Sequence, residues 1–130
     1  TGATERQLVQ AGMAYLTVHL HPSGHAGYYP GGKVMTLKVV FERETYRLLG
    51  AQAIGYEGVD KRIDVLATAI SLGAKAGDLF HLDLAYSPPF ATTKDPVHYT
   101  GMALTNALRH QASLITPAEL DARSAAGRER

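Results

Sequence analysis

A run of alternating residues over positions 35–42, followed by a turn and a second strand-like run up to position 56, constrains the fold of this chain more than any other feature. Apolar side chains occupy every second position of a first run, at Met35, Leu37, Val39 and Phe41. A period of two is that of a half-buried β-strand. Residues 43–47 then offer a turn and residues 48–56 a return strand, so the pattern predicts a β-hairpin.

The predicted return strand is unusually rich in small residues. It contains Gly50, Ala51, Ala53 and Gly55. Glycine inside a strand often marks a place where another backbone approaches closely. We therefore expect a second backbone, from a helix or a partner chain, directly against this strand.

Further elements flank the hairpin on both sides. Residues 14–20 alternate like a strand, and Thr4 and Gln7 form a capping-box pair at the start of a short helix that stops at Gly12. Helical spacing after the hairpin predicts helices over 58–73, from Asp78 as N-cap through Leu84, and from Asp95 through Leu108. This order predicts an α+β fold, with an antiparallel sheet of three or more strands covered by helices.

Length and charge narrow the class of protein. The chain has 130 residues, which suits one ordinary domain. Its 13 Lys and Arg residues against 12 Asp and Glu residues give a net charge of +1, so we expect no nucleic-acid partner. No apolar run is long enough for a membrane span and no signal peptide is visible, so we expect no membrane partner and a soluble, cytoplasmic protein.

The absence of cysteine restricts the chemistry that this chain can perform alone. With no Cys residue, it has no disulfide, no thiolate metal ligand and no cysteine nucleophile. Neither a Ser-His-Asp order nor a glycine-rich phosphate loop stands out. We therefore expect no self-sufficient catalytic set on the chain.

Two loops rich in Gly and Pro carry tyrosines. Residues 21–32 contain Tyr28 and Tyr29, and residues 85–96 contain Tyr86 and Phe90 beside three prolines. A phenol can donate a proton or a hydrogen bond to a thiolate or an oxyanion. The alternative interpretation is that these rings are half-buried packing aromatics.

The histidines and charged residues near these loops have simpler interpretations. His19, His21 and His25 lack a carboxylate at matching spacing, so we predict no metal site and exposed loop histidines. His81 and His98 are expected on helix surfaces. Asp95 is a helix cap and Lys94 is solvated. Asp60, Lys61 and Arg62 form a solvated first turn, or alternatively turn a cationic pair toward an anionic ligand.

Several motifs together resemble a known family. They are His25-Ala26-Gly27-Tyr28-Tyr29-Pro30-Gly31, Leu49-Gly50-Ala51-Gln52-Ala53-Ile54-Gly55, Gly58-Val59-Asp60-Lys61-Arg62-Ile63-Asp64-Val65, and Tyr86-Ser87-Pro88-Pro89-Phe90 with Lys94-Asp95-Pro96. In this order they resemble the C-terminal dimerisation domain of flavin-dependent pyridine nucleotide-disulfide oxidoreductases. The branch is the one that holds coenzyme A-disulfide reductase and NADH oxidase.

The resemblance implies that the chain is a piece of a longer flavoprotein. Residues 1–112 would be the dimerisation domain without its usual first strand, and 113–130 a linker or the start of a following domain. Residues 116–120 resemble the entry to a rhodanese domain. FAD, NAD(P)H and a redox-active cysteine would belong to the rest of the full-length protein, so the fragment alone would bind neither cofactor and turn over nothing.

The resemblance also assigns site residues. The domain would form a homodimer and lend Tyr86 and Tyr28 to the partner subunit's active site. Tyr86 would take the place of the catalytic histidine in glutathione reductase-like relatives. Both phenols would reach the partner's cysteine and the thiol of coenzyme A, with Tyr29 and Lys94 as further substrate contacts. The alternatives are an NADH oxidase, in which oxygen takes the electrons, and a stand-alone dimeric binding module without redox chemistry.

Overall fold

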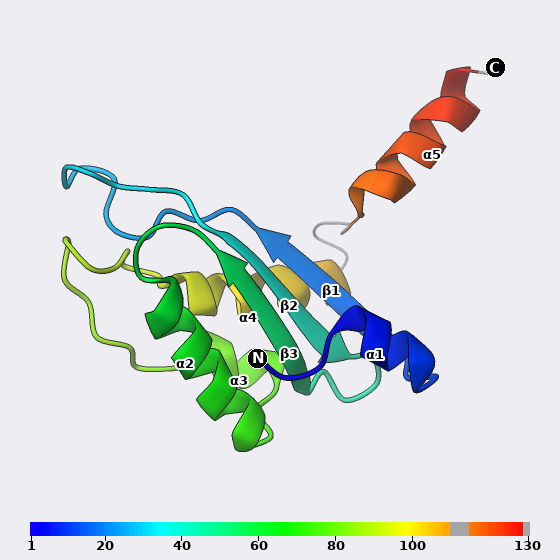
Figure 1. Ribbon diagram of the computed structural model, residues 1–130, viewed down its shortest axis with the longest axis horizontal. Helices are drawn as coiled ribbons and strands as arrows, with labels where there is room; N and C mark the ends of the chain where they lie inside the picture. The colour runs from blue at the N-terminus through cyan, green and yellow to red at the C-terminus, as the bar shows by residue number, and fades with distance from the viewer. Residues whose placement is uncertain (110–114, 129–130) are drawn as a thin grey trace.

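Three antiparallel strands form the centre of the computed structural model, which describes residues 1–109 and 115–128 (Figure 1). They are β1 (Tyr15–Leu20), β2 (Thr36–Glu42) and β3 (Leu48–Ile54), in the spatial order β1-β2-β3. Each neighbouring pair is antiparallel. The predicted hairpin is confirmed as β2 and β3, and the predicted α+β class is confirmed with it.

A bulge in β3 sets which of its side chains face the core. Val40 pairs with Gly50 and Phe41 pairs with Leu48, so Leu49 has no partner on β2. Because of this extra residue, Leu48 and Ala51 both join the same buried cluster although they are not separated by an even number of positions. The buried positions of β3 therefore do not follow a strict period of two.

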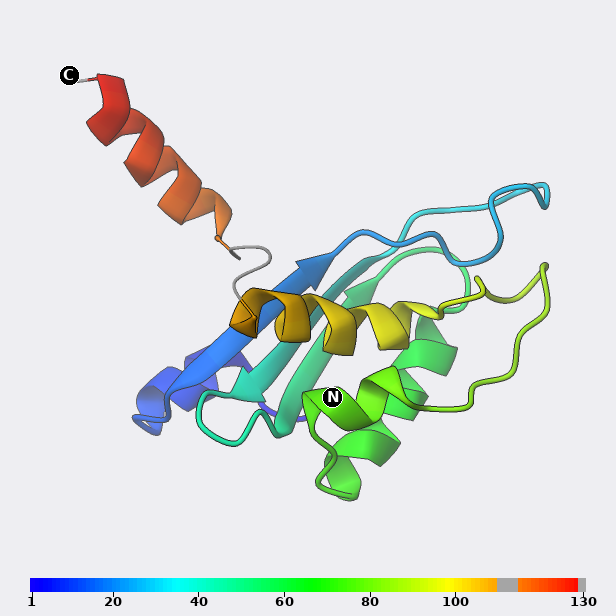
Figure 2. The same ribbon diagram turned by 180° about the vertical axis from the view of Figure 1, so that it is seen from behind.

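Three helices cover one face of the sheet. They are α2 (Val59–Ser71), α3 (Ala76–Phe80) and α4 (Pro96–Leu108), and Figure 2 shows α4 running along the sheet. The buried core between these layers contains Val18, Leu37, Val39, Phe41, Leu66, Leu79, Val97 and Leu104, with smaller residues among them. Burial of this apolar surface supplies the main driving force for the fold.

The short helix α1 (Glu5–Gln10) lies on the opposite face (Figure 1). The predicted capping box is confirmed, since Gln7 N–H donates to the Thr4 hydroxyl and Thr4 N–H donates to the Gln7 side chain. Glu5 fastens the helix to the strands through an ion pair with Lys38 of β2 and a hydrogen bond from Thr17 of β1 at 2.8 Å.

The backbone that approaches β3 is the chain's own N-terminal segment. Ala3 N–H donates to the Leu49 carbonyl, and Ala51 N–H donates to the Thr1 carbonyl, both at 2.9 Å. A Cβ atom added to Gly50 would lie only 1.9 Å from the Ala3 carbonyl oxygen, which explains the glycine. The expected close approach is confirmed, although a segment of the same chain makes it.

The predicted helix from Asp78 through Leu84 is wrong. Helix α3 spans Ala76–Phe80, and Asp78 sits inside it, where its carboxylate accepts the Lys75 N–H at 2.7 Å. The helix begins earlier because residues 74–76 are tied to the hairpin: Leu48 N–H donates to Ala74 and Ala76 N–H donates to Tyr46. The sequence shows no local sign of this tertiary pairing.

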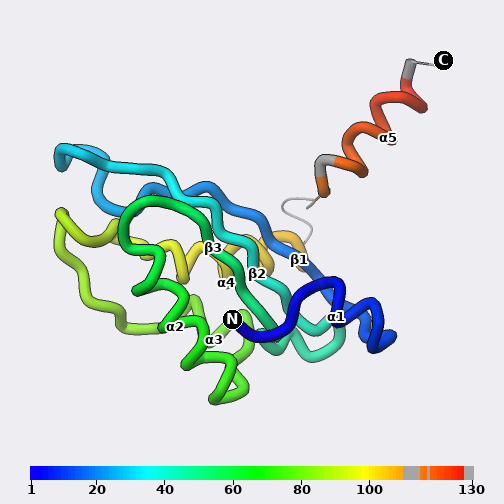
Figure 3. Tube along the Cα trace, in the orientation of Figure 1, coloured from blue at the N-terminus to red at the C-terminus, as the bar shows by residue number. Residues whose placement is uncertain are grey.

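Two long loops lie together at the same end of the sheet, as the trace in Figure 3 shows. One connects β1 to β2 over residues 21–35, and the other connects α3 to α4 over residues 81–95. They are the two tyrosine-bearing loops of the sequence. Strand and helix packing therefore brings together segments that are far apart in the chain.

The C-terminal part contains α5 (Pro117–Arg128). Thr116 and Glu119 form a capping box: Glu119 N–H donates to the Thr116 hydroxyl at 3.2 Å, and Thr116 N–H donates to the Glu119 carboxylate at 2.6 Å. The predicted boundary between 112 and 113 lies outside the described residues. Within those residues, no helix combines the length and the apolar character that crossing a membrane would require.

Candidate functional site

Tyr28 and Tyr86 meet where the two long loops come together. Their hydroxyl oxygens are 3.0 Å apart, at hydrogen-bonding distance. The Tyr28 side chain is 77% exposed and that of Tyr86 is 46% exposed. The structure thus brings together the two tyrosines singled out from sequence and leaves both accessible to another molecule.

Backbone hydrogen bonds hold the two loops against each other. The Ala26 N–H lies 3.3 Å from the Pro88 carbonyl oxygen and 3.1 Å from that of Ala91, and donates to both. Phe90 and Ala91 both donate their N–H to the Ser87 carbonyl, which closes the turn after the two prolines. The position of Tyr86 therefore depends on a turn that is bonded to the loop carrying Tyr28.

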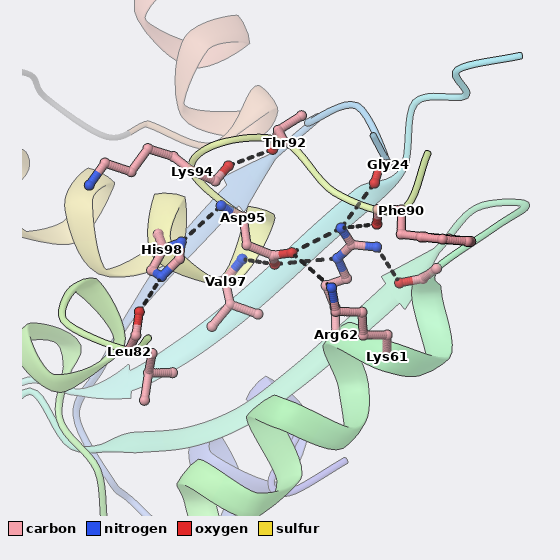
Figure 4. Close-up of polar contacts among 11 residues, drawn as sticks. Gly24, Lys61, Arg62, Leu82, Phe90, Thr92, Lys94, Asp95, Val97 and His98 are labelled. Atoms are coloured by element: carbon pink, nitrogen blue, oxygen red, sulfur yellow. Dashed lines mark hydrogen bonds and ion pairs between the residues drawn. The ribbon is translucent and has the colours of Figure 1, made fainter. Parts of the chain in front are cut away.

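A buried arginine lies beneath the loops (Figure 4). Arg62 of α2 is 1% exposed, and Asp95 is 3% exposed. Arg62 Nη2 donates to Asp95 Oδ2 at 2.9 Å, and Arg62 Nε donates to Asp95 Oδ1 at 3.3 Å. A bidentate pair of this kind is strong and directional.

The same guanidinium also binds three backbone carbonyls. Nη2 donates to the oxygens of Gly24 at 2.9 Å and Phe90 at 3.3 Å, and Nη1 donates to that of Gly58 at 3.0 Å. Gly24 belongs to the first tyrosine loop and Phe90 to the second. Arg62 therefore joins both loops to helix α2.

Asp95 also forms hydrogen bonds with residues at the start of α4. As predicted it is the N-cap, and its carboxylate accepts the Val97 N–H at 3.1 Å. Its own N–H donates to His98 Nδ1 at 2.8 Å, and His98 Nε2 donates to the Leu82 carbonyl at 2.7 Å. With Nδ1 as acceptor and Nε2 as donor, His98 is the neutral tautomer in this arrangement.

Three side chains expected at the surface are in fact buried, namely Arg62, His98 and His25. Arg62 was predicted to lie in a solvated first turn, but it belongs to the buried face of α2 with Leu66 and Ala69. The four-residue spacing from Arg62 to Leu66 was a signal in the sequence, because residues four apart share a helix face. His25 is enclosed by its own loop, where Nδ1 bonds the Ala26 carbonyl at 3.0 Å.

The hydrogen bond between the phenols has an electrostatic consequence. The pKa of Tyr28 is raised above its ordinary value, mainly because of the hydrogen bond with Tyr86, with burial as a smaller cause. A raised pKa keeps the Tyr28 phenol protonated at neutral pH. Whichever phenol accepts the shared bond keeps its own O–H proton for a third group.

The side chains of Tyr29 and Lys94 contact other aromatic rings. The Tyr29 ring packs edge-on against His25, with ring centroids 5.7 Å apart. Lys94 places its Nζ 5.1 Å from the centroid of the Phe80 ring, and its side chain extends away from Arg62 in Figure 4. The structure does not join either of them to the Tyr28–Tyr86 pair, and their predicted substrate contacts stay predictions.

The described residues contain no dinucleotide-binding fingerprint. Glycines 24, 27, 31 and 32 lie in a loop between two antiparallel strands, whereas a dinucleotide fingerprint sits between a strand and the helix that follows it. Over residues 1–109 and 115–128, no group of three His, Asp or Glu side chains could hold a metal ion. The chemistry open to the site is that of two phenols facing outward.

Comparison with known proteins gives a consistent result. A family model described as the dimerisation domain of pyridine nucleotide-disulphide oxidoreductases matches residues 1–96. The NAD(P)H sulfur oxidoreductase (CoA-dependent) of Pyrococcus furiosus is 44% identical over 97 residues, which is 75% of this chain and 22% of that protein. The coenzyme A disulfide reductase of Staphylococcus epidermidis is 41% identical over 87 residues, or 67% of this chain and 20% of that protein.

A solved structure extends the similarity. The crystal structure of reduced Bacillus anthracis CoADR-RHD has a TM-score of 0.92 and 37% identity, and the match covers 98% of this chain and 23% of that one. The chain thus spans about a fifth of the length of the relatives that it matches.

Proposed function

The chain belongs to the family of pyridine nucleotide-disulphide oxidoreductase dimerisation domains, and we propose that it is the dimerisation and substrate-contact domain of an FAD-dependent NAD(P)H disulfide oxidoreductase. The substrate class that we propose is coenzyme A disulfide or a related persulfide. The names of the relatives from S. epidermidis and P. furiosus support this class. The single observation in this chain that carries the proposal is the exposed hydroxyl pair of Tyr28 and Tyr86, 3.0 Å apart.

The phenol pair suits the chemistry of a departing thiolate. In disulfide exchange an attacking thiolate forms a new S–S bond while the old S–S bond breaks and a second thiolate leaves. A phenol beside the leaving sulfur stabilises its developing charge by a hydrogen bond or by transfer of its proton. Tyr28 and Tyr86 would share this task, because a bond between the two hydroxyls polarises the outer O–H.

The attacking thiolate and the electrons must come from outside this chain, which has no cysteine. We place FAD, the NAD(P)H site and the redox cysteine in the remainder of the full-length protein. The overall reaction would be NAD(P)H plus a proton plus coenzyme A disulfide giving NAD(P)⁺ and two coenzyme A thiols. In the chemical step, the described residues would contribute the two phenols, which hold and donate protons.

We further propose a homodimer in which the Tyr28–Tyr86 pair serves the partner subunit's active site. An apolar groove supports a self-association face on this domain. Its apolar lining consists of Val65, Ala69, Leu72, Ala74, Leu82 and Leu84, and Asp64, Thr68 and Asp78 also line it. Leu72 is 80% exposed, and an exposed patch of this kind is typical of an interaction surface.

We also propose roles for Tyr29, Lys94 and the C-terminal segment. Tyr29 lies next to Tyr28 in the chain and is partly exposed, and Lys94 lies in the Tyr86 loop, so both would contact the substrate at the edge of the site. Residues 113–130 would lead into a following domain of the rhodanese type. The CoADR-RHD match covers 98% of this chain, so the similarity reaches into that segment.

The experiment that tests this function is an assay of the full-length protein with three electron acceptors. NAD(P)H oxidation is followed under anaerobic conditions with coenzyme A disulfide or a coenzyme A persulfide, and in air without a disulfide. We expect turnover with a coenzyme A acceptor in the absence of oxygen. Turnover with oxygen alone would replace the proposal with an NADH oxidase, and no turnover in a flavin-free dimer would replace it with a binding module.

A further inference from the structure

Arg62 connects four segments of the chain at one point. Its guanidinium donates to the carbonyl oxygens of Gly24, Gly58 and Phe90 and to the carboxylate of Asp95. Gly24 precedes Tyr28 by four positions, and Phe90 follows Tyr86 by four. Both tyrosine loops are therefore attached to a single rigid group at a similar distance along the chain from each phenol (Figure 4).

No other side chain plays this part in the described structure. Across residues 1–109 and 115–128, Arg62 is the side chain that hydrogen-bonds to both loops. The loops also bond to each other directly, through the backbone contact from Ala26 to Pro88 and Ala91 and through the hydroxyls of Tyr28 and Tyr86. Loss of Arg62 would remove the anchor that Gly24 and Phe90 share, so the loop tips that carry the two phenols would be free to shift relative to each other and to helix α2.

Arg62 and Asp95 are too deeply buried to bind a substrate themselves. They are 1% and 3% exposed, and Lys61 at the rim adds a second cation 3.8 Å from Asp95 Oδ2. A buried charged pair of this kind is weak support for stability, since well-packed apolar residues often replace such pairs without loss. Its geometry here suits a different purpose, because a planar guanidinium fixes several acceptors in defined directions.

We infer that Arg62 and Asp95 are positioning residues, which set the separation of the Tyr28 and Tyr86 hydroxyls by anchoring both loops to helix α2. The catalytic meaning of this inference rests on the proposed function. Its geometric content does not, because the distance between the two phenols can be measured without any turnover.

The geometric test is oxidative cross-linking of the full-length protein. Brief photo-oxidation with a ruthenium tris-bipyridyl complex and persulfate converts neighbouring tyrosines to a dityrosine, in which a carbon–carbon bond forms between the rings. The joined peptides that contain Tyr28 and Tyr86 are quantified by mass spectrometry from the monomer band. We expect the product in the natural sequence and its loss in the Tyr28→Phe variant.

The test variant is Arg62→Lys, which keeps the charge but not the planar fork. We expect its cross-link yield to fall to the level of Tyr28→Phe. The matched control is Arg47→Lys, the same chemical change at a half-exposed side chain in the hairpin turn, and it should leave the yield unchanged. Turnover with coenzyme A disulfide should fall by about 10- to 100-fold in kcat with the KM for NAD(P)H unchanged.

A second variant covers the risk that Arg62→Lys fails to fold. Arg62→Met combined with Asp95→Asn removes both charges and keeps an acceptor for the Val97 N–H, while the carbonyls of Gly24 and Phe90 still lose their donor. Flavin content and sedimentation identify folded protein. A full cross-link yield in either folded variant would overturn the inference. Failure of both to fold would overturn it as well, because the pair would then support the core and not the loops.

The two hypotheses fail separately. If Tyr28→Phe and Tyr86→Phe keep full turnover, the proposed function is wrong, while the cross-link yield of Arg62→Lys still decides the positioning role. If that yield is unchanged, the positioning role is wrong whatever the tyrosines do.

Discussion

The hydroxyl of Tyr28 lies 3.0 Å from the hydroxyl of Tyr86, although 58 positions separate the two residues in the chain. Tyr28 lies in the loop that connects two strands, β1 and β2. Tyr86 lies in the loop that connects two helices, α3 and α4. The contact gives this domain an exposed pair of coupled phenols, and it is the part of the structure from which the proposed thiol chemistry follows.

The Tyr28 pKa should depend on Tyr86. It is raised above the ordinary tyrosine value of 10.0 mainly by the hydrogen bond between the two hydroxyls. The Tyr86→Phe variant removes that bond, so the Tyr28 pKa should fall toward the ordinary value. Titration of ¹³C-labelled tyrosine rings by NMR measures it. Tyr56→Phe, at another exposed tyrosine, should not shift the Tyr28 titration, and an unchanged Tyr28 pKa in Tyr86→Phe would count against the bond.

Helix α1 should lose part of its attachment in acid. The Lys38 ammonium is the main cause of the lowered pKa of Glu5, with the Thr17 hydroxyl acting in the same direction and burial opposing them. A carboxyl whose folded pKa is lowered stabilises the fold above its ordinary pKa and loses that contribution as the pH falls through the folded value. Lys38→Met should therefore weaken α1 by about 0.5–1 kcal/mol at neutral pH.

Hydrogen exchange of the α1 amides, corrected for intrinsic rates, measures this effect. The difference between Lys38→Met and the natural sequence should shrink as the pH falls below 4.5, the ordinary value for glutamate. Lys33→Met, in the loop between β1 and β2, is the matched control and should leave α1 unchanged. A difference that stays constant with pH would show that Lys38 acts through its packing and not through Glu5.

Gly50 should not tolerate a larger residue. In Gly50→Ala the new Cβ would lie 1.9 Å from the Ala3 carbonyl oxygen, a backbone atom that cannot move without breaking the pairing of residues 1–3 with β3. We expect destabilisation of about 1–3 kcal/mol, the range typical of overpacking. Faster hydrogen exchange at the Ala3 and Ala51 amides would report it.

Gly77 provides the contrast for Gly50. No atom lies within 4 Å of a Cβ added there, and the residue is part of helix α3. Gly77→Ala should be neutral or stabilising by up to about 1 kcal/mol, because alanine favours the helix. Equal effects of the two substitutions would contradict the close approach at Gly50.

The apolar groove should control self-association. Replacing Leu72 or Leu84 by Asp places a charge in the proposed interface, and each change should raise the dimer Kd of the full-length protein by at least about ten-fold. Val9→Asp, at an exposed apolar residue of α1 on the other face of the sheet, is the control. Sedimentation over a range of concentrations measures the Kd, and an unaltered Kd in both leucine variants would place the dimer contact elsewhere.

Local patterns in the sequence predicted the elements that depend on near neighbours. The hairpin of β2 and β3, the capping box of Thr4 and Gln7, and the Asp95 cap at the start of α4 all formed as expected. Each is decided by alternation or by bonds between residues three or four apart, which a single sequence displays directly.

The predictions that were wrong, and the features that were missed, depend on contacts between distant segments. The spacing to Leu66 places Arg62 on the buried face of α2, but Arg62 and Asp95 are 33 positions apart, and nothing local shows that a distant helix cap will be its partner. Helix α3 begins before its predicted start because residues 74–76 pair with the hairpin. The pairing of Tyr28 with Tyr86 was anticipated only through family resemblance, since the residues themselves left packing aromatics as an alternative interpretation.

The most direct test of the account is the turnover of coenzyme A disulfide by the full-length protein with Tyr28→Phe and Tyr86→Phe combined. Both rings remain and only the hydroxyls are lost, so the loops should keep their packing. We predict that kcat falls by about 100-fold or more, the range for loss of a general acid, while flavin reduction by NAD(P)H keeps its rate. Tyr56→Phe should behave like the natural sequence. Full disulfide turnover in the double variant would contradict the assignment of the phenol pair to thiol chemistry.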